Sequence, residues 1–329
     1  MAEVTVREAL NIALGEELAR DQNVFLIGEE VGHYNGAYKV SQNLMARFGE
    51  DRVIDTPIAE AGFAGLAIGA AMAGLRPIVE FMTWNFSLVA IDQIINNAAK
   101  MHLMSGGQFN MPIVFRAPQG AGGSLCAQHS SILESFYTYT PGLIVVAPST
   151  PTDMRGLLKT SVRSDNPVIF LEHEKIYAVK GELEHADVPD FMIPFGVAAL
   201  HAAASEPQLT ILCWSLTVHV VKQAAERLAA EGIFADILDL RSLKPVDSEA
   251  IIAAAQKTHR LLIVQEATPV ASYGAWLSHH IQEIAFDELD APVKVVSSDD
   301  VPMPYTFSLE PQVLPNLERI IAAAKELVA

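Results

Sequence analysis

The sequence predicts an α/β protein of two domains, each built around a parallel sheet. Short apolar runs alternate with longer stretches of helical periodicity, which is the pattern of buried parallel strands joined by crossover helices. The alternation fades between about residues 180 and 206, where glycine and proline interrupt a mixed acidic and apolar stretch, and it then begins again. At 329 residues, the chain is long enough for two ordinary domains.

The first predicted element is a helix with an N-terminal capping box. Thr5 and Glu8 have the spacing of that motif, and the apolar residues that follow recur on one helical face. Apolar runs then predict the strands of the first domain, which are 24–27, 77–81, 112–115, 144–147 and 168–171.

A second series of elements follows the interruption. Its predicted strands are 209–213, 235–240, 261–265 and 293–296, and its predicted helices include 218–230 and 314–328. No repeat of short fixed period occurs, so a solenoid is not expected.

Composition restricts the function classes. The formal net charge of -17 argues against nucleic acid as a partner and favours a basic protein partner. Half of the residues are hydrophobic and the mean hydropathy is +0.26, yet no apolar run reaches the length of a membrane span. We therefore expect no membrane association, and we expect apolar surface to be buried against other subunits.

The two cysteines and the N-terminal segment bear on the compartment. Cys126 and Cys213 lie far apart without zinc-type spacing, which fits a reducing environment. The first residues have neither an apolar signal core nor an Arg-rich transit composition, so we expect a cytoplasmic protein. A trimmed organellar protein would have the same features.

Glu60 directly precedes residues 61–75, which contain no polar side chain. A carboxylate that enters apolar surroundings loses hydration, so its pKa tends to rise and it can transfer protons near neutrality. The structural alternative is a helix that starts at Asp55-Thr56-Pro57, with an acid in its first turns that complements the helix dipole.

Three loops after predicted strands are candidate sites, because ligands of open parallel sheets bind at the carboxyl ends of the strands. They begin at Gly28, Phe81 and Arg116, and the last is rich in glycine and leads to His129. This loop lacks the Lys-Ser/Thr ending of a phosphate-binding P-loop, so we favour a turn that presents His129. A structural histidine is the alternative. Neither a Gly-x-Ser-x-Gly elbow nor a His-Glu-x-x-His pair occurs.

Six motifs together identify a family. They are Gly-Glu-Glu-Val (28–31), Gly-Ala-Tyr-Lys-Val-Ser (36–41), Asp-Thr-Pro-Ile-Ala-Glu-Ala-Gly-Phe (55–63), Glu-Phe-Met-Thr (80–83), Ala-Gln-His-Ser (127–130) and Asp-Val-Pro-Met-Pro-Tyr (300–305). With these motifs in this order, the chain closely resembles the beta subunits of the thiamine diphosphate-dependent E1 component of 2-oxo acid dehydrogenase complexes. The resemblance implies a pyrimidine-binding thiamine diphosphate domain (1–180), a linker (181–206) and a transketolase C-terminal-type domain (207–329).

The resemblance also implies roles for individual residues. Glu60 would hydrogen-bond N1' of the cofactor's aminopyrimidine, Phe86 would stack on that ring and Met82 would lie beside it. His129 would stand near the reacting end and assist acyl transfer to the lipoyl arm of E2, unless it only orients its loop. Glu29 and Asp92 would join Glu60 in an acidic passage between paired active sites, unless they are solvated or cap helices.

A potassium site is a further implication of the resemblance. The residues whose backbone carbonyls match it are Ile113, Ser161, Val162, Ser164 and Asn166. Ser164 stands where the family often has an acidic residue, which puts the ion in question.

The expected partners follow from what the chain lacks. Thiamine enzymes hold the diphosphate through magnesium, typically with a Gly-Asp-Gly motif that is absent here. The resemblance therefore implies that an alpha subunit supplies magnesium and the other half of the site, in an alpha2-beta2 heterotetramer. Asp290 and the carboxylate of Ala329 match acidic positions that bind the basic peripheral-subunit-binding domain of E2, although a solvated acidic face is the alternative.

The resemblance implies an enzyme that decarboxylates a 2-oxo acid oxidatively and transfers the acyl group to lipoyl-E2. The motifs favour pyruvate over branched-chain 2-oxo acids, and acetoin is a third candidate substrate. The alternative from another class is a non-catalytic regulatory or binding subunit of the same fold.

Overall fold

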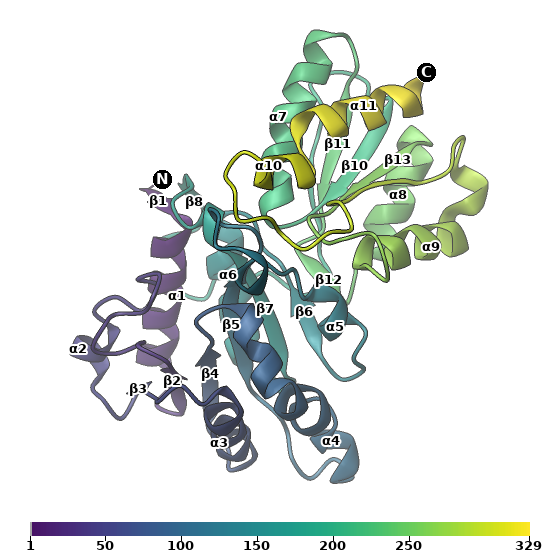
Figure 1. The fold of residues 1–329 in the computed structure, drawn as a ribbon. Coiled ribbons are helices and arrows are strands. Elements are labelled where there is room, and N and C mark those ends of the chain that lie inside the picture. Colours follow the sequence, from purple (N-terminus) through teal and green to yellow (C-terminus); the bar gives the residue numbers. More distant parts are fainter. Residues whose placement is uncertain (1) are drawn as a thin grey trace. The chain divides into compact units, whose positions relative to one another are not determined.

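The computed structural model describes residues 2–329 and divides the chain into two compact units (Figure 1). The first comprises residues 1–119 and 136–195, and the second comprises residues 120–135 and 196–329. Each is an α/β unit, which confirms the predicted fold class. None of the helices described is both long and apolar enough to cross a membrane.

A parallel sheet forms the centre of the first unit. Its strands are β2 (Val24–Gly28), β3 (Val53–Asp55), β4 (Arg76–Glu80), β5 (Val114–Gln119), β6 (Ile144–Val146) and β7 (Val168–His173). Within this unit they lie in the order β6-β7-β5-β4-β2-β3, and neighbouring strands are parallel. Every residue of β2, β5 and β7 is buried, as continuous apolar runs predict for a sheet covered on both faces.

The helical segments of the first unit lie between these strands. They are α1 (Val6–Arg20), α2 (Leu44–Phe48), α3 (Glu60–Met72), η1 (Trp84–Ala90), η2 (Gln93–Ala98), α4 (Met101–Met104), α6 (Pro151–Arg163) and η4 (Glu174–Ile176). A further helix, α5 (Glu134–Thr138), spans the junction between the units. The predicted capping box is confirmed: the Thr5 side chain accepts from the Glu8 N–H, and the Glu8 side chain accepts from Thr5.

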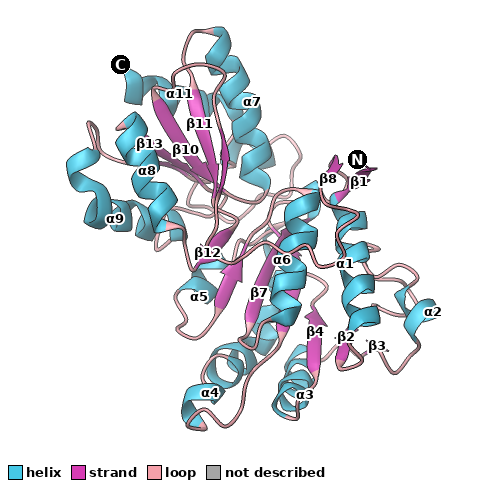
Figure 2. Ribbon diagram, turned by 180° about the vertical axis from the view of Figure 1, so that it is seen from behind, coloured by secondary structure: helices cyan, strands magenta, loops and turns pink. Residues whose placement is uncertain are grey.

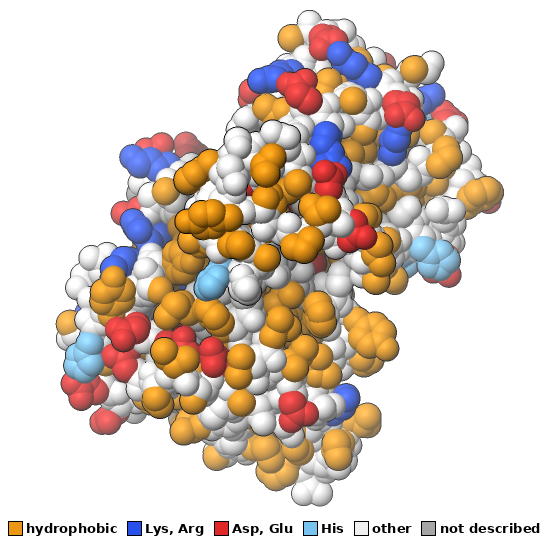
Figure 3. All heavy atoms as spheres, viewed as in Figure 1, with side chains coloured by type: hydrophobic (Ala, Val, Ile, Leu, Met, Phe, Trp, Pro, Cys, Tyr) orange, Lys and Arg blue, Asp and Glu red, His pale blue; other side chains and the backbone are white. Residues whose placement is uncertain are grey.

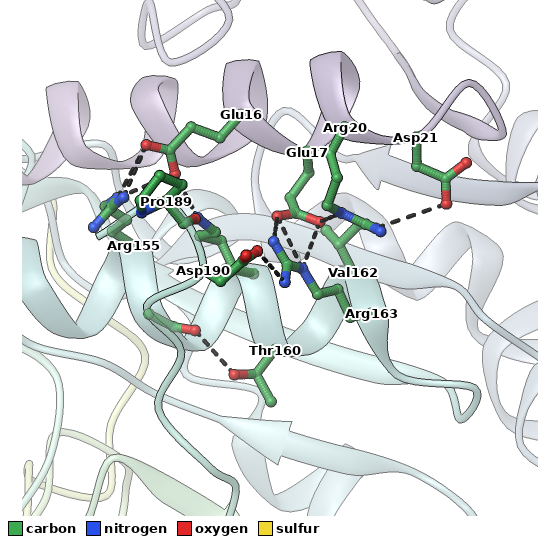
Figure 4. Close-up of polar contacts among 12 residues, drawn as sticks. Glu16, Glu17, Arg20, Asp21, Arg155, Thr160, Val162, Arg163, Pro189 and Asp190 are labelled. Atoms are coloured by element: carbon green, nitrogen blue, oxygen red, sulfur yellow. Dashed lines mark hydrogen bonds and ion pairs between the residues drawn. The ribbon is translucent and has the colours of Figure 1, made fainter. Parts of the chain in front are cut away.

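Helices α1 and α6 pack together over the sheet (Figure 2) and are joined by buried charge pairs. The Arg155 guanidinium and the Lys159 ammonium both bind the Glu16 carboxylate, at 2.9 and 2.7 Å (Figure 4). Glu17 binds Arg163 one turn further along the interface, at 2.8 Å. These contacts satisfy cations that would be costly to bury alone.

The segment expected as a linker contains two strands that the sequence pattern does not predict. One is β8 (Lys180–Leu183), which pairs antiparallel with β1 (Ala2–Thr5). The other is β9 (Ala199–His201), an antiparallel edge strand of the second unit. Both are short and partly exposed, so neither produces an apolar run.

The second unit has its own sheet, in the order β14-β13-β10-β11-β9. The strands of this sheet are β9, β10 (Leu209–Cys213), β11 (Ala235–Asp239), β13 (Leu261–Val264) and β14 (Lys294–Val296). The unit also contains the short strand β12 (Ser242–Lys244), which is not part of this sheet. Its helical segments are η3 (Ala127–His129), α7 (Leu216–Ala230), α8 (Ser248–Thr258), α9 (Tyr273–Ala285), η5 (Phe286–Glu288), α10 (Glu310–Val313) and α11 (Leu317–Val328). Helix α7 packs on α11 and α8 packs on α9, and the buried residues of α7 and α11 form one core with the sheet.

Candidate active site

Two buried carboxyl groups meet where β2 ends and α3 begins. Glu29 follows the last residue of β2, and Glu60 is the first residue of α3. Their exposed fractions are 4% and 5%, and the carboxyl of Glu60 is close enough to affect the pKa of Glu29. The structure therefore brings together two of the acidic residues that the sequence singled out.

Tight backbone packing positions this pair. A Cβ at Gly28 would overlap the backbone oxygen of Glu80, so only glycine lets β2 turn into the Glu29 loop beside β4. The Asp55 carboxylate accepts from the N–H groups of Gly32 and His33, at 2.6 and 2.9 Å. The loop is thus fixed to the end of β3.

These contacts contradict the alternative interpretation, in which a helix starts at Asp55-Thr56-Pro57. Asp55 is the last residue of β3, and its carboxylate binds the Glu29 loop instead of capping a helix. Helix α3 begins at Glu60, after Ala59, whose side chain makes no cap. Glu60 therefore lies at the helix N-terminus, where the backbone dipole favours a negative charge.

Electrostatics set the pair apart from ordinary acids. The pKa of Glu29 is raised to about 7, mainly by burial and to a lesser extent by the charge of Glu60 and a hydrogen bond with it. Glu29 can therefore hold a proton near neutral pH. Glu29 Oε1 is buried without a hydrogen-bond partner, which leaves an acceptor for a ligand N–H or O–H.

The segment after β4 carries Met82 and Phe86, both half-buried. Phe86 lies on η1, which packs against α3. A chain of aromatic contacts fixes this arrangement: Phe81 lies between Phe63 of α3 and Trp84 of η1, with ring centroids 5.6 and 5.8 Å apart. Met82 and Phe86 therefore lie on a segment held rigidly against the helix that begins with Glu60.

Asp92 is not joined to the carboxyl pair by the contacts described. It precedes η2 and accepts a hydrogen bond from Asn96, 2.6 Å away, within its own helical turn. Helix α3 does approach η2 closely, because a Cβ at Gly65 would lie 3.3 Å from Gln93 Oε1.

A buried ionic network beside the pair was not predicted. The Arg116 side chain is 1% exposed and forms ion pairs with Glu80 and with Glu172, the latter at 2.5 Å. The Tyr177 hydroxyl also donates a hydrogen bond to Glu172. Burial raises the pKa of Glu80, although the charge of Arg116 opposes this shift. Burial also raises the pKa of Tyr177. The sequence did contain a signal: Glu80, Arg116 and Glu172 are ionisable residues in largely apolar strands.

His129 belongs to the second unit, on residues 120–135, which we call the histidine segment. It is the last residue of η3, and its side chain is exposed. Its backbone N–H donates to the Cys126 carbonyl, 3.2 Å away, as does the Ser130 hydroxyl at 2.8 Å. The prediction of a turn that presents His129 agrees with this geometry.

Among residues 2–329, no three His, Cys, Asp or Glu side chains are arranged as ligands for one metal ion.

Comparison with known proteins identifies the family. Residues 2–180 match the pyrimidine binding domain of transketolase, and residues 198–320 match the transketolase C-terminal domain. The chain is 49% identical, over 99% of its length and 98% of the relative's, to the pyruvate dehydrogenase E1 component subunit beta of Rickettsia felis. The chain belongs to the family of pyruvate dehydrogenase E1 beta subunits.

Other E1 beta relatives come from bacteria and from mitochondria. The Rhizobium meliloti subunit is 49% identical over 99% of this chain and 70% of its own length. The mitochondrial subunit of Dictyostelium discoideum is 48% identical over 99% of this chain and 91% of its own. A solved structure titled split gene transketolase, inactive beta4 tetramer, has the same fold, with a TM-score of 0.79, 22% identity and coverage of 99% and 98%.

Two of the five carbonyls expected at a potassium site accept hydrogen bonds from an arginine in this structure. Arg76 donates to the carbonyls of Val162 and Ser164, at 2.9 and 2.6 Å. Those of Ile113 and Ser161 accept from backbone N–H groups, at 2.9 and 3.2 Å. A carbonyl oxygen has two lone pairs, so each can still bind a cation.

The two acidic positions expected at the E2-binding surface of an E1 beta subunit are both exposed. Asp290 lies 3.5 Å from the Arg260 guanidinium, so part of its charge is already paired. Ala329 directly follows α11.

Proposed function

We propose that this chain is the beta subunit of a pyruvate dehydrogenase E1 component, which decarboxylates pyruvate oxidatively and transfers the acetyl group to lipoyl-E2. The observation that carries the proposal is the buried Glu29–Glu60 pair, in a chain with 48–49% identity to such subunits over nearly its full length. A non-catalytic regulatory subunit would not need a buried carboxyl that holds a proton near neutral pH and has an oxygen without a hydrogen-bond partner.

The residues present fit the pyrimidine half of thiamine diphosphate. Glu29 Oε1 offers a buried acceptor, and a ring N–H donor would satisfy it or the neighbouring Glu60 carboxylate. When bound, the cofactor supplies the electron sink that decarboxylation of a 2-oxo acid needs. The proposal places Glu60 at the ring nitrogen N1', and it places Met82 and Phe86 beside the ring.

In this mechanism, Glu60 would exchange a proton with N1' of the bound cofactor. Glu29, whose raised pKa lets it hold its own proton near neutral pH, would keep a second negative charge out of the buried site. We also propose that Asp92 extends the acidic passage, and that His129 assists acyl transfer.

An alpha subunit completes the proposed enzyme. We propose that it supplies the magnesium site and the diphosphate half of the pocket, in an alpha2-beta2 heterotetramer. Support comes from large exposed hydrophobic side chains on and near α3 and α4, namely Ile58, Leu66, Val89, Leu103 and Met104, which are 59–83% exposed. Figure 3 shows hydrophobic side chains at the bottom of the view, where Figure 1 places these helices.

Further proposals concern the domain limits, the ions and the assembly. We retain residues 1–180 and 207–329 as the two domains, with 181–206 between them. We propose potassium at the carbonyls of Ile113, Ser161, Val162, Ser164 and Asn166, docking of E2 at Asp290 and Ala329, and a cytoplasmic location.

The substrate can be tested with the reconstituted alpha2-beta2 enzyme. Pyruvate, 2-oxoisovalerate and acetoin would be compared by kcat/KM under identical conditions. We expect pyruvate to have the highest value. A preference for 2-oxoisovalerate or acetoin would assign the chain to a branched-chain or acetoin dehydrogenase instead.

A further inference from the structure

Two buried carboxylates of the second unit bind the backbone of the histidine segment. Glu266, just after β13, accepts from the Ala121 N–H at 2.7 Å. Glu310, the first residue of α10, accepts from the Ser124 N–H at 2.8 Å. Both carboxylates are buried, with exposed fractions of 8% and 3%, so these charge-assisted bonds are shielded from water. They lie upstream of His129, on the stretch that leads to it.

A third contact fixes the other end of the segment. The Trp214 Nε1–H, just after β10, donates to Glu134 Oε2 at 2.9 Å. The pKa of Glu134 is raised to about 8, mainly by burial, with the Trp214 hydrogen bond opposing the shift and the charge of Glu266 adding to it. At neutral pH, Glu134 is therefore mostly protonated, so that it does not repel Glu266.

The backbone between these contacts has a conformation that it would not adopt unaided. Ser124 and Cys126 have φ angles of 62° and 71°, in the left-handed region that side chains with a Cβ disfavour. Such conformations persist only where the surroundings determine them. The bond that Glu310 accepts is made by Ser124 itself, at one of the two disfavoured positions.

We propose that Glu266 and Glu310 are positioning residues, which fix the backbone of the histidine segment so that His129 is presented for acyl transfer. The inference rests on the proposed function, because it requires His129 to act on the acyl group. The His129 side chain is exposed, and the backbone of the histidine segment determines where it can reach. Loss of either carboxylate should therefore affect the step that needs His129 more than the decarboxylation.

The test uses the alpha2-beta2 enzyme with its E2 and compares two reactions. Decarboxylation is measured with 2,6-dichlorophenolindophenol as oxidant, and acyl transfer is measured with lipoyl-E2. For Glu266→Ala and Glu310→Ala, we expect acyl transfer to fall at least about tenfold while dye reduction changes less than about twofold, because only one step uses His129. Glu310→Gln retains an acceptor oxygen and should restore most of the transfer.

Hydrogen exchange of the Ala121 and Ser124 amides tests the segment directly. We expect faster exchange of Ala121 in Glu266→Ala and of Ser124 in Glu310→Ala. Asp236→Ala is the matched control, since this buried carboxylate of the same unit also accepts a backbone N–H, that of Ala203 at 2.9 Å. Its loss should lower stability without changing the ratio of acyl transfer to dye reduction.

The outcomes separate this inference from the proposed function. Unchanged exchange and an unchanged ratio in both alanine variants would overturn the inference, as would an equal fall of the ratio in Asp236→Ala. If His129→Ala retains full acyl transfer while both amides exchange faster in the alanine variants, the role of His129 is wrong and the fixing contacts stand.

Discussion

The carboxyl groups of Glu29 and Glu60 form a buried pair at the N-terminus of α3, and burial and the charge of Glu60 both contribute to the raised pKa of Glu29. The pair depends on two neighbouring strand ends, since β2 leads into Glu29 and β3 leads toward Glu60. Because the strands are parallel and adjacent, residues 31 positions apart in sequence are brought into contact. The local physical chemistry of the proposed reaction follows from this contact.

Glu29→Gln should change how stability depends on pH. The pKa of Glu29 is raised to about 7 in the folded chain, from an ordinary value of 4.5. The folded state therefore binds more protons between these values, and wild-type stability falls as pH rises from about 4.5 to about 7. We expect Glu29→Gln to gain melting temperature relative to wild type over this range and to keep the gain above it.

Thermal unfolding of the cofactor-free enzyme at a series of pH values checks this prediction. Glu50→Gln, an exposed acid of the same unit, serves as the control and should follow wild type. Parallel curves for wild type and Glu29→Gln would contradict the raised pKa.

Arg116→Met should destabilise the first unit strongly. The change leaves Glu80 and Glu172 buried without their shared cation, which costs about 3–5 kcal/mol for a broken buried ion pair. Denaturant unfolding measures the loss. Adding Glu80→Gln and Glu172→Gln to the Arg116 variant should recover part of it, because the uncompensated charges are then removed.

Arg227→Met is the control for Arg116. Its ion pair with Glu318 is exposed, so its loss should cost less than about 1 kcal/mol. Equal losses in the two arginine variants would mean that the buried network has no special cost.

The isolated chain should bind thiamine diphosphate weakly, even with magnesium present. In the proposed function, the carboxyl pair would bind only the pyrimidine end, and the described residues include no cluster of three His, Cys, Asp or Glu ligands for a metal. Calorimetry on the isolated chain and on the tetramer would measure the difference. Tight, magnesium-dependent binding to the isolated chain would refute the shared site.

Much of the fold could be predicted because its strands are buried on both faces. Strand β10 has the predicted bounds, and β2, β4, β7 and β13 differ from them by only one or two residues at an end. Strands β8 and β9 were missed because short, partly exposed antiparallel strands leave no apolar run.

The site was predicted only in part. Glu60 was singled out because an acid beside a long apolar run is conspicuous, and its role remains a prediction. The nearness of Glu29 comes from strand order, which periodicity does not contain. The Arg116 network and the contacts of Glu266 and Glu310 were missed for the same reason, since each joins residues from different elements. Local patterns identify such residues as unusual without giving their partners.

The most direct test of the account is the kcat of Glu60→Gln in the alpha2-beta2 enzyme with saturating pyruvate and cofactor. Glutamine preserves the size of the side chain and removes its ability to exchange a proton. We predict that kcat falls at least about tenfold, the effect typical of a general acid–base group, while Glu50→Gln retains wild-type activity. A Glu60→Gln enzyme with wild-type kcat would contradict the central claim and leave a non-catalytic subunit as the better interpretation.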